Sequence, residues 1–398
     1  MAPPPDLMLS IEDIKIAGSK KLPPMAREFY NSGSTTQITV TENTTAYNKY
    51  RLRPRVLVDV STLNLSLNLF NQTFDFPLGI SPTGIQAMAH PEGELATSRA
   101  AAKRNIPMAV SSFATYPVEE IVNAAREPNP PTPKAEQTPT PESSQPVGIE
   151  LGRGGRGGHL IQLYTLRSRT LQTQILHRAE SAGCKAIFLT ADSPVLGVRY
   201  NELRNDFRTP PGLSWPMLNL SSEDIQAQTH DSGFMGANSD KHSWAREIPW
   251  LRSITNMEIW IKGVLTAEDV LLAREYGCDG VVVSNHGGRQ LDGVLATVDA
   301  LPECVRAAEG KIRVHVDGGI RSGVDVFKAL ALGAECCWIG RPVIWGLAYD
   351  GEKGVSRVLD ILYDEFKRCM QLTGCRTLAD ITPAALARLC PDGTVARL

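Results

Sequence analysis

The sequence has almost no net charge and no long apolar run. Of its 398 residues, 41 are basic and 43 acidic, so the formal net charge is −2 and a general affinity for nucleic acid or anionic membranes is not expected. No apolar stretch approaches the roughly 18 residues of a membrane span. The first residues contain neither the basic nor the apolar region of a secretory signal. We therefore expect a non-secreted globular protein without a membrane or nucleic-acid partner.

Cysteine is present but lacks the spacing that metal or redox chemistry would require. The eight cysteines form no C-x-x-C pair and no zinc-ligand pattern. Most of them lie in apolar or helical stretches, which is typical of reduced, buried thiols in an intracellular protein. We expect no metal site.

From about residue 76 onward, short apolar runs alternate with amphipathic segments. The amphipathic segments include 92–105, 168–183, 266–277 and 322–333, and several end in glycine, as helix C-termini prefer. The apolar runs are nearly continuous, as in strands of a parallel sheet covered on both faces. They span residues 77–82, 107–112, 159–164, 186–192, 258–263, 280–285, 313–318 and 336–340. Eight strand–helix units predict a (β/α)8 TIM barrel. A doubly wound open sheet is the alternative, which fits eight units less naturally.

The barrel is expected to span residues 76–398, with residues 1–75 forming a helical and extended segment that packs on it. Two long insertions interrupt the pattern, one after the second strand and one after the fourth. Residues 127–158 are rich in proline and glycine and predict a mobile surface loop. Their Arg/Gly run at 152–158 has an alternative interpretation as an RNA-binding segment. Residues 201–245 predict an active-site lid.

Polar residues follow the C-terminal ends of all eight predicted strands, where barrel enzymes place their functional groups. They are Thr83, Ser111, Gln162, Tyr164, Thr190, Asp192, Lys262, Ser284, His286, Arg289, Asp317, Arg321 and Arg341. One such placement would mean little, but the whole series favours an enzyme.

Glycine and arginine occur together after the last two strands, in the segments 317–321 and 340–341. Glycine allows close backbone approach and arginine adds a cation, which suits a phosphate group. The alternative is a pair of tight turns with surface arginines.

The candidate catalytic base is His286, with Asp192 as a carboxylate partner that would stabilise its protonated form. A structural role is the alternative for this histidine. Arg289 and Arg199 are suited to bind a substrate carboxylate through forked hydrogen bonds. Lys262 follows an apolar strand and would be a costly buried cation unless it faced a negative group. A cofactor that gains negative charge on reduction would serve.

The motifs SNHGGRQLD, DGGIRSGVDVFKALALGA, IGRPVIWGLA, PTGIQAMAHPEGE, IQLY, LTADSPVLGVR and KGVLTAEDV resemble those of the FMN-dependent α-hydroxy acid oxidase/dehydrogenase family, from about residue 21 to about residue 377. The resemblance implies FMN at the barrel mouth, and a 2-hydroxy acid and O2 as small-molecule partners. The products would be a 2-oxo acid and hydrogen peroxide. The first alternative is a 2-hydroxy acid (L-lactate) dehydrogenase that passes electrons to a quinone or cytochrome. The second is a catalytically silent flavin-binding or RNA-associating protein.

The resemblance also implies roles for individual residues. The cofactor contacts are Pro82, Thr83, Gly84, Ser111, Gln162, Thr190, Lys262, Ser284, Asp317, Gly318, Gly319, Arg321, Gly340 and Arg341. The catalytic residues are His286 as base, Asp192 as its support, Tyr164 on the substrate oxygen, Arg199 and Arg289 on the carboxylate, and Lys262 beside the reduced flavin. The hydride and carbanion routes both stay open, and either needs an unprotonated His286.

Three positions depart from the glycolate oxidases of the family. Phe29 replaces a tyrosine whose hydroxyl helps to bind the carboxylate, and Phe113 replaces a tryptophan. Both changes make the substrate pocket more apolar or roomier and predict a preference for medium-chain, long-chain or aromatic 2-hydroxy acids, although simple core packing is the alternative. Gly84 replaces an alanine and leaves the dehydrogenase alternative open.

The last three residues, Ala396-Arg397-Leu398, resemble the peroxisomal address S-K-L. We therefore expect binding to the peroxisomal import receptor and a peroxisomal location, with the cytoplasm as the alternative. Analogy with the family adds the expectation of a homotetramer.

Overall fold

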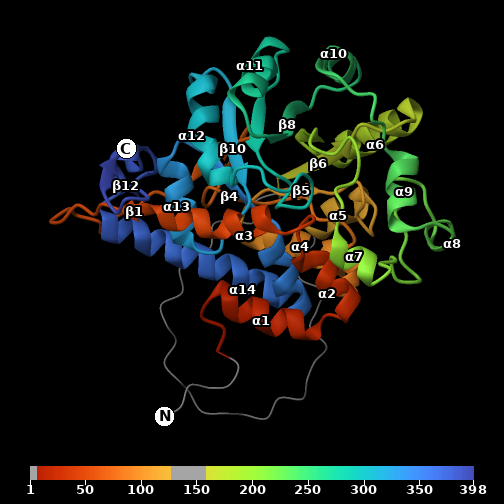
Figure 1. Ribbon diagram of the computed structural model, residues 1–398, viewed down its shortest axis with the longest axis horizontal. Coiled ribbons are helices and arrows are strands. Elements are labelled where there is room, and N and C mark those ends of the chain that lie inside the picture. The colour runs from red at the N-terminus through yellow and green to blue at the C-terminus, as the bar shows by residue number, and fades with distance from the viewer. Residues whose placement is uncertain (1–6, 127–157) are drawn as a thin grey trace.

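The computed structural model describes residues 7–126 and 158–398 (Figure 1). Its centre is a closed barrel of eight parallel strands, so the predicted (β/α)8 fold is confirmed. In chain order the strands are β4 (Leu78–Ile80), β5 (Met108–Val110), β6 (His159–Tyr164), β7 (Ala186–Thr190), β8 (Glu258–Val264), β9 (Gly280–Val283), β10 (Arg313–Asp317) and β11 (Cys336–Ile339). Most end slightly before the predicted boundary, because the polar residues that follow each apolar run turn into the loops of the mouth.

The barrel interior is filled by aromatic side chains at the end opposite the C-terminal mouth. Phe188, Trp260 and Trp338 are buried there, and the hairpin of β2 (Leu67–Leu69) and β3 (Gln72–Phe74) packs against the same cluster. Glycine is required on two strands: a Cβ on Gly280 would lie 2.2 Å from the Trp260 ring, and one on Gly79 would lie 2.5 Å from the Trp338 ring. The filled end leaves the opposite mouth as the place for a ligand.

Helices alternate with the strands and cover the outside of the barrel (Figure 1). They are α4 (Gly93–Lys103), α5 (Val118–Ala124), α6 (Arg169–Ala182), α10 (Trp244–Ile254), α11 (Ala267–Glu275), α12 (Thr297–Ala308), α13 (Gly323–Ala331) and α14 (Arg341–Thr373). The four helices predicted from periodicity are all present. Ser168, Thr266 and Ser322 act as N-caps whose side chains accept a backbone N–H of the first turn.

The N-terminal segment contributes α1 (Ile11–Lys21), α2 (Pro24–Asn31), α3 (Ile38–Thr45) and β1 (Tyr50–Leu52). Helix α1 packs along α14 (Figure 1). Asn43 of α3 exchanges two side-chain hydrogen bonds of 2.8 Å with Asn285, next to the candidate base. This part of the N-terminal segment therefore forms one wall of the barrel mouth.

The C-terminal residues form a small antiparallel sheet with β1. Strand β12 (Leu386–Leu389) pairs with β1 and with β13 (Val395–Arg397). The residues of β13 are exposed.

The second insertion is not the long loop that we predicted. It contains α7 (Tyr200–Arg204), α8 (Ser222–Gln226) and α9 (His230–Ala237) before α10 begins. The local cause is capping, because Ser221 and Asp224 form a reciprocal box at the start of α8. The first insertion lies outside the described residues, except for Gly158. No helix among the described residues combines the length and the apolar character needed to span a membrane.

Candidate active site

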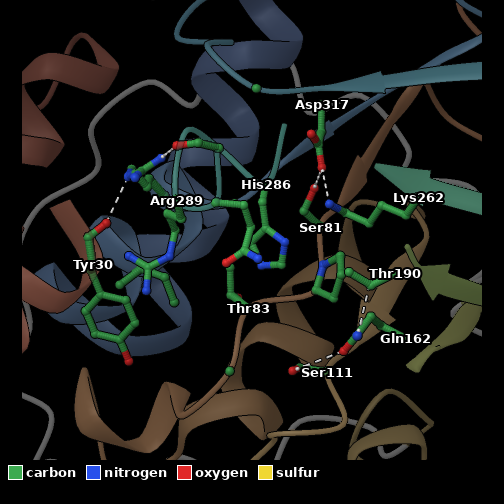
Figure 2. A pocket seen from close by; sticks show the side chains of 18 of the residues that line it. Tyr30, Ser81, Thr83, Ser111, Gln162, Thr190, Lys262, His286, Arg289 and Asp317 are labelled. Atoms are coloured by element: carbon green, nitrogen blue, oxygen red, sulfur yellow. Dashed lines mark hydrogen bonds and ion pairs between the residues drawn. The ribbon is translucent and has the colours of Figure 1, made fainter. Parts of the chain in front are cut away.

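A pocket opens at the C-terminal mouth of the barrel (Figure 2). It encloses about 1250 Å³ of atom-free space, part of it open to solvent. The structure brings nearly all of the predicted site residues together on its wall. They are Phe29, Pro82, Thr83, Gly84, Ser111, Phe113, Gln162, Tyr164, Thr190, Arg199, Lys262, His286, Arg289, Asp317, Gly318, Gly319, Arg321, Gly340 and Arg341.

The candidate base lies in a strained turn after β9. His286 has φ +58°, a left-handed conformation that is uncommon for residues other than glycine, and Gly287 and Gly288 continue in the same conformation. Its Nδ1 lies 2.9 Å from an Asp192 carboxylate oxygen, and the Ser193 hydroxyl donates to the same oxygen at 3.0 Å. Because a carboxylate only accepts, Nδ1 carries the proton and Nε2 keeps its lone pair.

The protonation state of His286 suits a base. Burial lowers the pKa of His286, and the positive charge of Lys262 acts in the same direction, although Asp192 opposes both. The imidazole is therefore neutral at neutral pH. Its Nε2 lies 3.5 Å from the Tyr164 hydroxyl on the pocket wall (Figure 2 shows the histidine). Asp192 does not line the pocket itself and can act only through His286.

Two guanidinium groups, predicted to bind a carboxylate, line the pocket. Arg199 is buried and the Arg289 side chain is 15% exposed, and each donates to Glu202 at 3.3 Å. Arg289 also donates to the Phe29 carbonyl and lies over the Phe29 ring at 4.8 Å. Burial beside Arg199 lowers the pKa of Arg289 to about 10, so the group is still cationic at neutral pH.

Sequence reasoning missed Glu202, the carboxylate between these two arginines. Its charge offsets the repulsion between two neighbouring buried cations. A signal was present, since Glu202 follows Arg199 by about one helical turn in α7 and such pairs face each other.

Lys262 has a negative partner in the protein itself, whereas the sequence led us to expect a cofactor that gains negative charge on reduction. Its Nζ lies 3.1 Å from Asp317 and donates to Ser284 at 2.8 Å (Figure 2 shows Lys262 and Asp317). Asp317 was predicted to contact the cofactor only. Ser284 was also predicted to contact the cofactor, but it is fully buried behind Lys262 and its hydroxyl accepts from Lys262 and from the His286 backbone. It does not line the pocket.

The expected phosphate site lies where α14 begins. Gly340 is its N-cap and supplies no side-chain cap. Pro342 has no N–H, and the Val343 N–H donates to the Gly340 carbonyl at 3.0 Å, so the Arg341 N–H is the group of this first turn that is left for an anion. At α13, by contrast, Ser322 and Asp325 form a capping box. The phosphate site is therefore favoured at α14.

The two arginines beside this helix terminus are half-buried cations that donate to carbonyls. Arg321 donates to the Ile320 carbonyl and lies over Trp345, while Arg341 donates to the carbonyls of Tyr30, Ser32 and Gly287. Burial lowers the pKa of Arg321 to about 10. Within residues 7–126 and 158–398, neither guanidinium forms an ion pair with a carboxylate.

These residues fit FMN. Two guanidiniums without a carboxylate partner among the described residues, together with the Arg341 backbone N–H at the positive end of α14, suit a phosphate dianion. One buried Asp317 oxygen, Oδ1, has no hydrogen-bond partner among the described residues, and it can accept from a ribityl hydroxyl. Arg321, Arg341 and Asp317 would hold the phosphate and ribityl chain, and Lys262 would face the ring system with a positive charge.

Several residues of the wall were not predicted. Phe234 comes from α9 of the second insertion, and Leu196 from the loop after β7. Tyr30 lines the pocket, but its hydroxyl donates to the Ile85 carbonyl at 2.6 Å. The remaining ones are Ser81, Ile85, Ser193, Gly287, Gln290, Ile320, Trp338, Ile339 and Ile344.

The barrel and the charges at its mouth together define a flavin mononucleotide oxidoreductase. The chain belongs to the FMN-dependent α-hydroxy acid oxidase/dehydrogenase family: residues 18–388 match the family model described as FMN-dependent dehydrogenase. Its cofactor is therefore FMN.

Individual relatives are similar over nearly the whole chain. Oxidase FUB9 of Fusarium oxysporum f. sp. lycopersici is 40% identical, covering 98% of this chain and 93% of its own. Glycolate oxidase 3 of Arabidopsis thaliana is 43% identical, covering 92% of each chain. A crystal structure of mandelate oxidase superimposes with a TM-score of 0.81 at 32% identity, covering 96% of this chain and 98% of that one.

Proposed function

We propose that the protein oxidises (S)-2-hydroxy acids to 2-oxo acids and passes the electrons to O2, which yields hydrogen peroxide. The observation that carries the proposal is the convergence of a neutral imidazole and two guanidiniums on one pocket that fits FMN. His286 Nε2 is an available base, and Arg199 and Arg289 are available cations for a carboxylate. A 2-hydroxy acid has a carboxylate and an alcohol carbon on adjacent atoms.

Each residue has a specific task in this proposal. Arg199 and Arg289 bind the substrate carboxylate and orient the alcohol carbon, and the Tyr164 hydroxyl bonds the substrate oxygen. Oxidation of the alcohol removes two electrons and two protons, of which His286 Nε2 takes one. Asp192, at 2.9 Å from Nδ1, stabilises the imidazolium that results. Bound FMN would supply the acceptor for the two electrons and for the second proton.

The apolar wall supports a preference for larger substrates. Phe113 and Phe234 are stacked with ring centroids 5.8 Å apart, and Tyr164 meets Phe234 edge-on at 5.4 Å. Phe29 stacks on Phe207 at 4.4 Å, and its side chain has no hydroxyl to offer a carboxylate. Such a surface gains free energy from an apolar substrate side chain. We propose medium-chain, long-chain or aromatic 2-hydroxy acids over glycolate.

The alternative is a dehydrogenase that uses a quinone or cytochrome, and Gly84 is the observation that favours it. A Cβ at Gly84 would lie 3.1 Å from the Phe113 Cβ and 3.5 Å from the Ser111 hydroxyl. The position is therefore crowded, and the methyl group of an alanine would fit there only if Phe113 moved by a few tenths of an ångström. The curated relatives that carry oxidase names support O2 as the acceptor.

Anaerobic titration of the holoenzyme separates these possibilities. The assay follows the visible flavin absorbance while glycolate, 2-hydroxy acids of increasing chain length and mandelate are added under nitrogen, and air is then admitted. The proposal expects bleaching, with kcat/KM higher for the larger acids, and rapid recovery of the colour in air. Slow recovery in air with rapid recovery on adding a quinone favours the dehydrogenase, and highest kcat/KM with glycolate refutes the stated preference.

A further inference from the structure

Two threonine hydroxyls on the pocket wall are held in the same way by buried glutamines. Gln86 Nε2 donates to Thr83 Oγ1 at 2.9 Å, and Gln162 Nε2 donates to Thr190 Oγ1 at 3.0 Å (Figure 2 shows the second pair). Both glutamines are buried, and both threonines line the pocket. Gln162 is already a predicted cofactor contact, whereas Gln86 lies outside the wall and has no assigned role.

The orientation of each amide is fixed by a backbone group that has a single hydrogen-bonding role. The Ser112 backbone N–H can only donate, and it lies 3.1 Å from Gln162 Oε1. The Thr83 carbonyl can only accept, and it lies 3.3 Å from Gln86 Nε2. Gln86 Oε1 in turn accepts from the Thr97 hydroxyl at 2.6 Å. Reversing either amide would place two donors or two acceptors against each other.

The direction of these hydrogen bonds determines whether each threonine hydroxyl can act as a donor or as an acceptor toward the pocket. Each Oγ1 receives an N–H, so its own proton remains for another acceptor. In the part of the chain that the structure describes, neither hydroxyl donates to a protein group. Both are therefore available as donors at the pocket wall. The ring system of oxidised FMN carries several acceptors for such donors, namely its carbonyl oxygens and unprotonated ring nitrogens.

We propose that Gln86 is a positioning residue that holds the Thr83 hydroxyl as a hydrogen-bond donor toward FMN. Gln86 acts through Thr83 and does not touch the cofactor. The proposal rests on FMN binding by the family and not on the identity of the substrate.

Gln86 is itself held by a buried carboxylate. Glu94, in the first turn of α4, is fully buried and accepts from the backbone N–H of Gln86 at 3.0 Å and of Thr115 at 3.1 Å. Burial raises the pKa of Glu94, and no basic side chain forms an ion pair with it among the described residues. Glu94 thereby joins the loop that carries Thr83 to the loop that carries Ser111 and keeps both at a fixed distance from the cofactor site.

A double-mutant cycle on FMN affinity tests the proposal. Gln86→Met keeps the size of the side chain and removes its hydrogen bonds, and Thr83→Val removes the donor. FMN dissociation constants are measured for both single variants and the double variant by flavin fluorescence. We expect Gln86→Met to weaken FMN binding about 2- to 10-fold when Thr83 is present, the range for one neutral hydrogen bond. In the Thr83→Val background the same change should have little effect.

Equal weakening in both backgrounds would overturn the proposal, because a residue that only supports the fold acts independently of Thr83. Unchanged FMN affinity of Gln86→Met would overturn it too. Gln172→Met is the matched control, since Gln172 is also fully buried but its amide bonds Arg169 and the Tyr164 carbonyl. It should leave FMN affinity unchanged in both backgrounds.

If Gln86→Met fails to fold, Thr97→Val removes one bond to the same amide and takes its place in the cycle. The same coupling to Thr83 is expected, and its absence contradicts the proposal. The outcome is independent of the proposed activity, because FMN affinity is measured without substrate. If the cycle shows coupling between Gln86 and Thr83 but no 2-hydroxy acid reduces the flavin, the role of Gln86 stands and only the proposed substrate class is wrong.

Discussion

Asp192→Asn removes the negative charge beside His286 while the side chain keeps its size and one acceptor oxygen. The Nδ1–Oδ1 distance is 2.9 Å, so the charge centres of an imidazolium and the carboxylate lie about 4 Å apart, where the attraction is about 4 kcal/mol at an effective dielectric constant of 20. The charge on His286 develops only as it takes a proton. The rate of flavin reduction should therefore fall by up to about 10³-fold.

The assay for this change is anaerobic stopped-flow reduction of the bound flavin at saturating substrate. Ser193→Ala is the comparison variant, because Ser193 contacts the same pair through a neutral hydroxyl. Its loss should stay within about 10-fold. A loss of less than about 10-fold for Asp192→Asn would refute the assignment of Asp192 as the group that stabilises the imidazolium.

The pH dependence of the same reaction tests the role of His286 as the base independently. Burial lowers the pKa of His286, so the base is protonated and inactive only below its ordinary value of 6.5. In the wild type, kcat/KM should rise with pH through a pKa below 6.5 and be level at neutral pH, until Arg289, whose burial lowers its pKa to about 10, begins to lose its charge. Asp192 opposes this lowering of the pKa of His286, so Asp192→Asn should move the acid limb to lower pH. A limb that moves upward contradicts this interpretation.

Three further substitutions test other parts of the site. Lys262→Met leaves the buried Asp317 carboxylate without its cation, and breaking such a pair costs about 3–5 kcal/mol. FMN retention or flavin reduction should therefore be impaired. If both are normal, Lys262 does not have the role proposed for it. Glu202→Gln leaves the buried Arg199 and the neighbouring Arg289 without their shared carboxylate. The free energy of unfolding should therefore fall by about 3 kcal/mol in urea titrations, and unchanged stability argues against the pairing. Phe29→Tyr adds a hydroxyl near the carboxylate site, and it should raise kcat/KM for glycolate about 2- to 10-fold, which a steady-state comparison with a long-chain acid would show or exclude.

The sequence predicted the barrel well because each of its strands is a short apolar run that needs no partner to be recognised. Runs such as Ala186–Thr190 and Gly280–Val283 are buried on both faces and are followed at once by polar residues. Since the C-terminal ends of parallel strands meet at one mouth, the convergence of Thr190, Lys262 and His286 followed from the fold.

Other parts of the site depend on tertiary packing that no local pattern reveals. Lys262 and Asp317 meet because β8 and β10 flank the same strand, β9, in the closed barrel. Phe234 comes from an inserted helix and stacks on Phe113. Gln86 bonds Thr83 of the pocket wall and is itself held by Thr97 of α4, a contact that depends on tertiary packing. The capping box at Ser221 was a local signal for a helix in the second insertion that the prediction of a lid loop overlooked. The peroxisomal address and the homotetramer stay predictions.

The most direct test of the proposed chemistry is anaerobic flavin reduction in the His286→Ala holoenzyme. The variant should bind FMN as tightly as the wild type, because His286 contacts Asp192 and Tyr164 and not the phosphate site. Its flavin should be bleached by a 2-hydroxy acid about 10²–10⁴-fold more slowly than that of the wild type. Bleaching at the wild-type rate would contradict the account, since the imidazole could then not be the base.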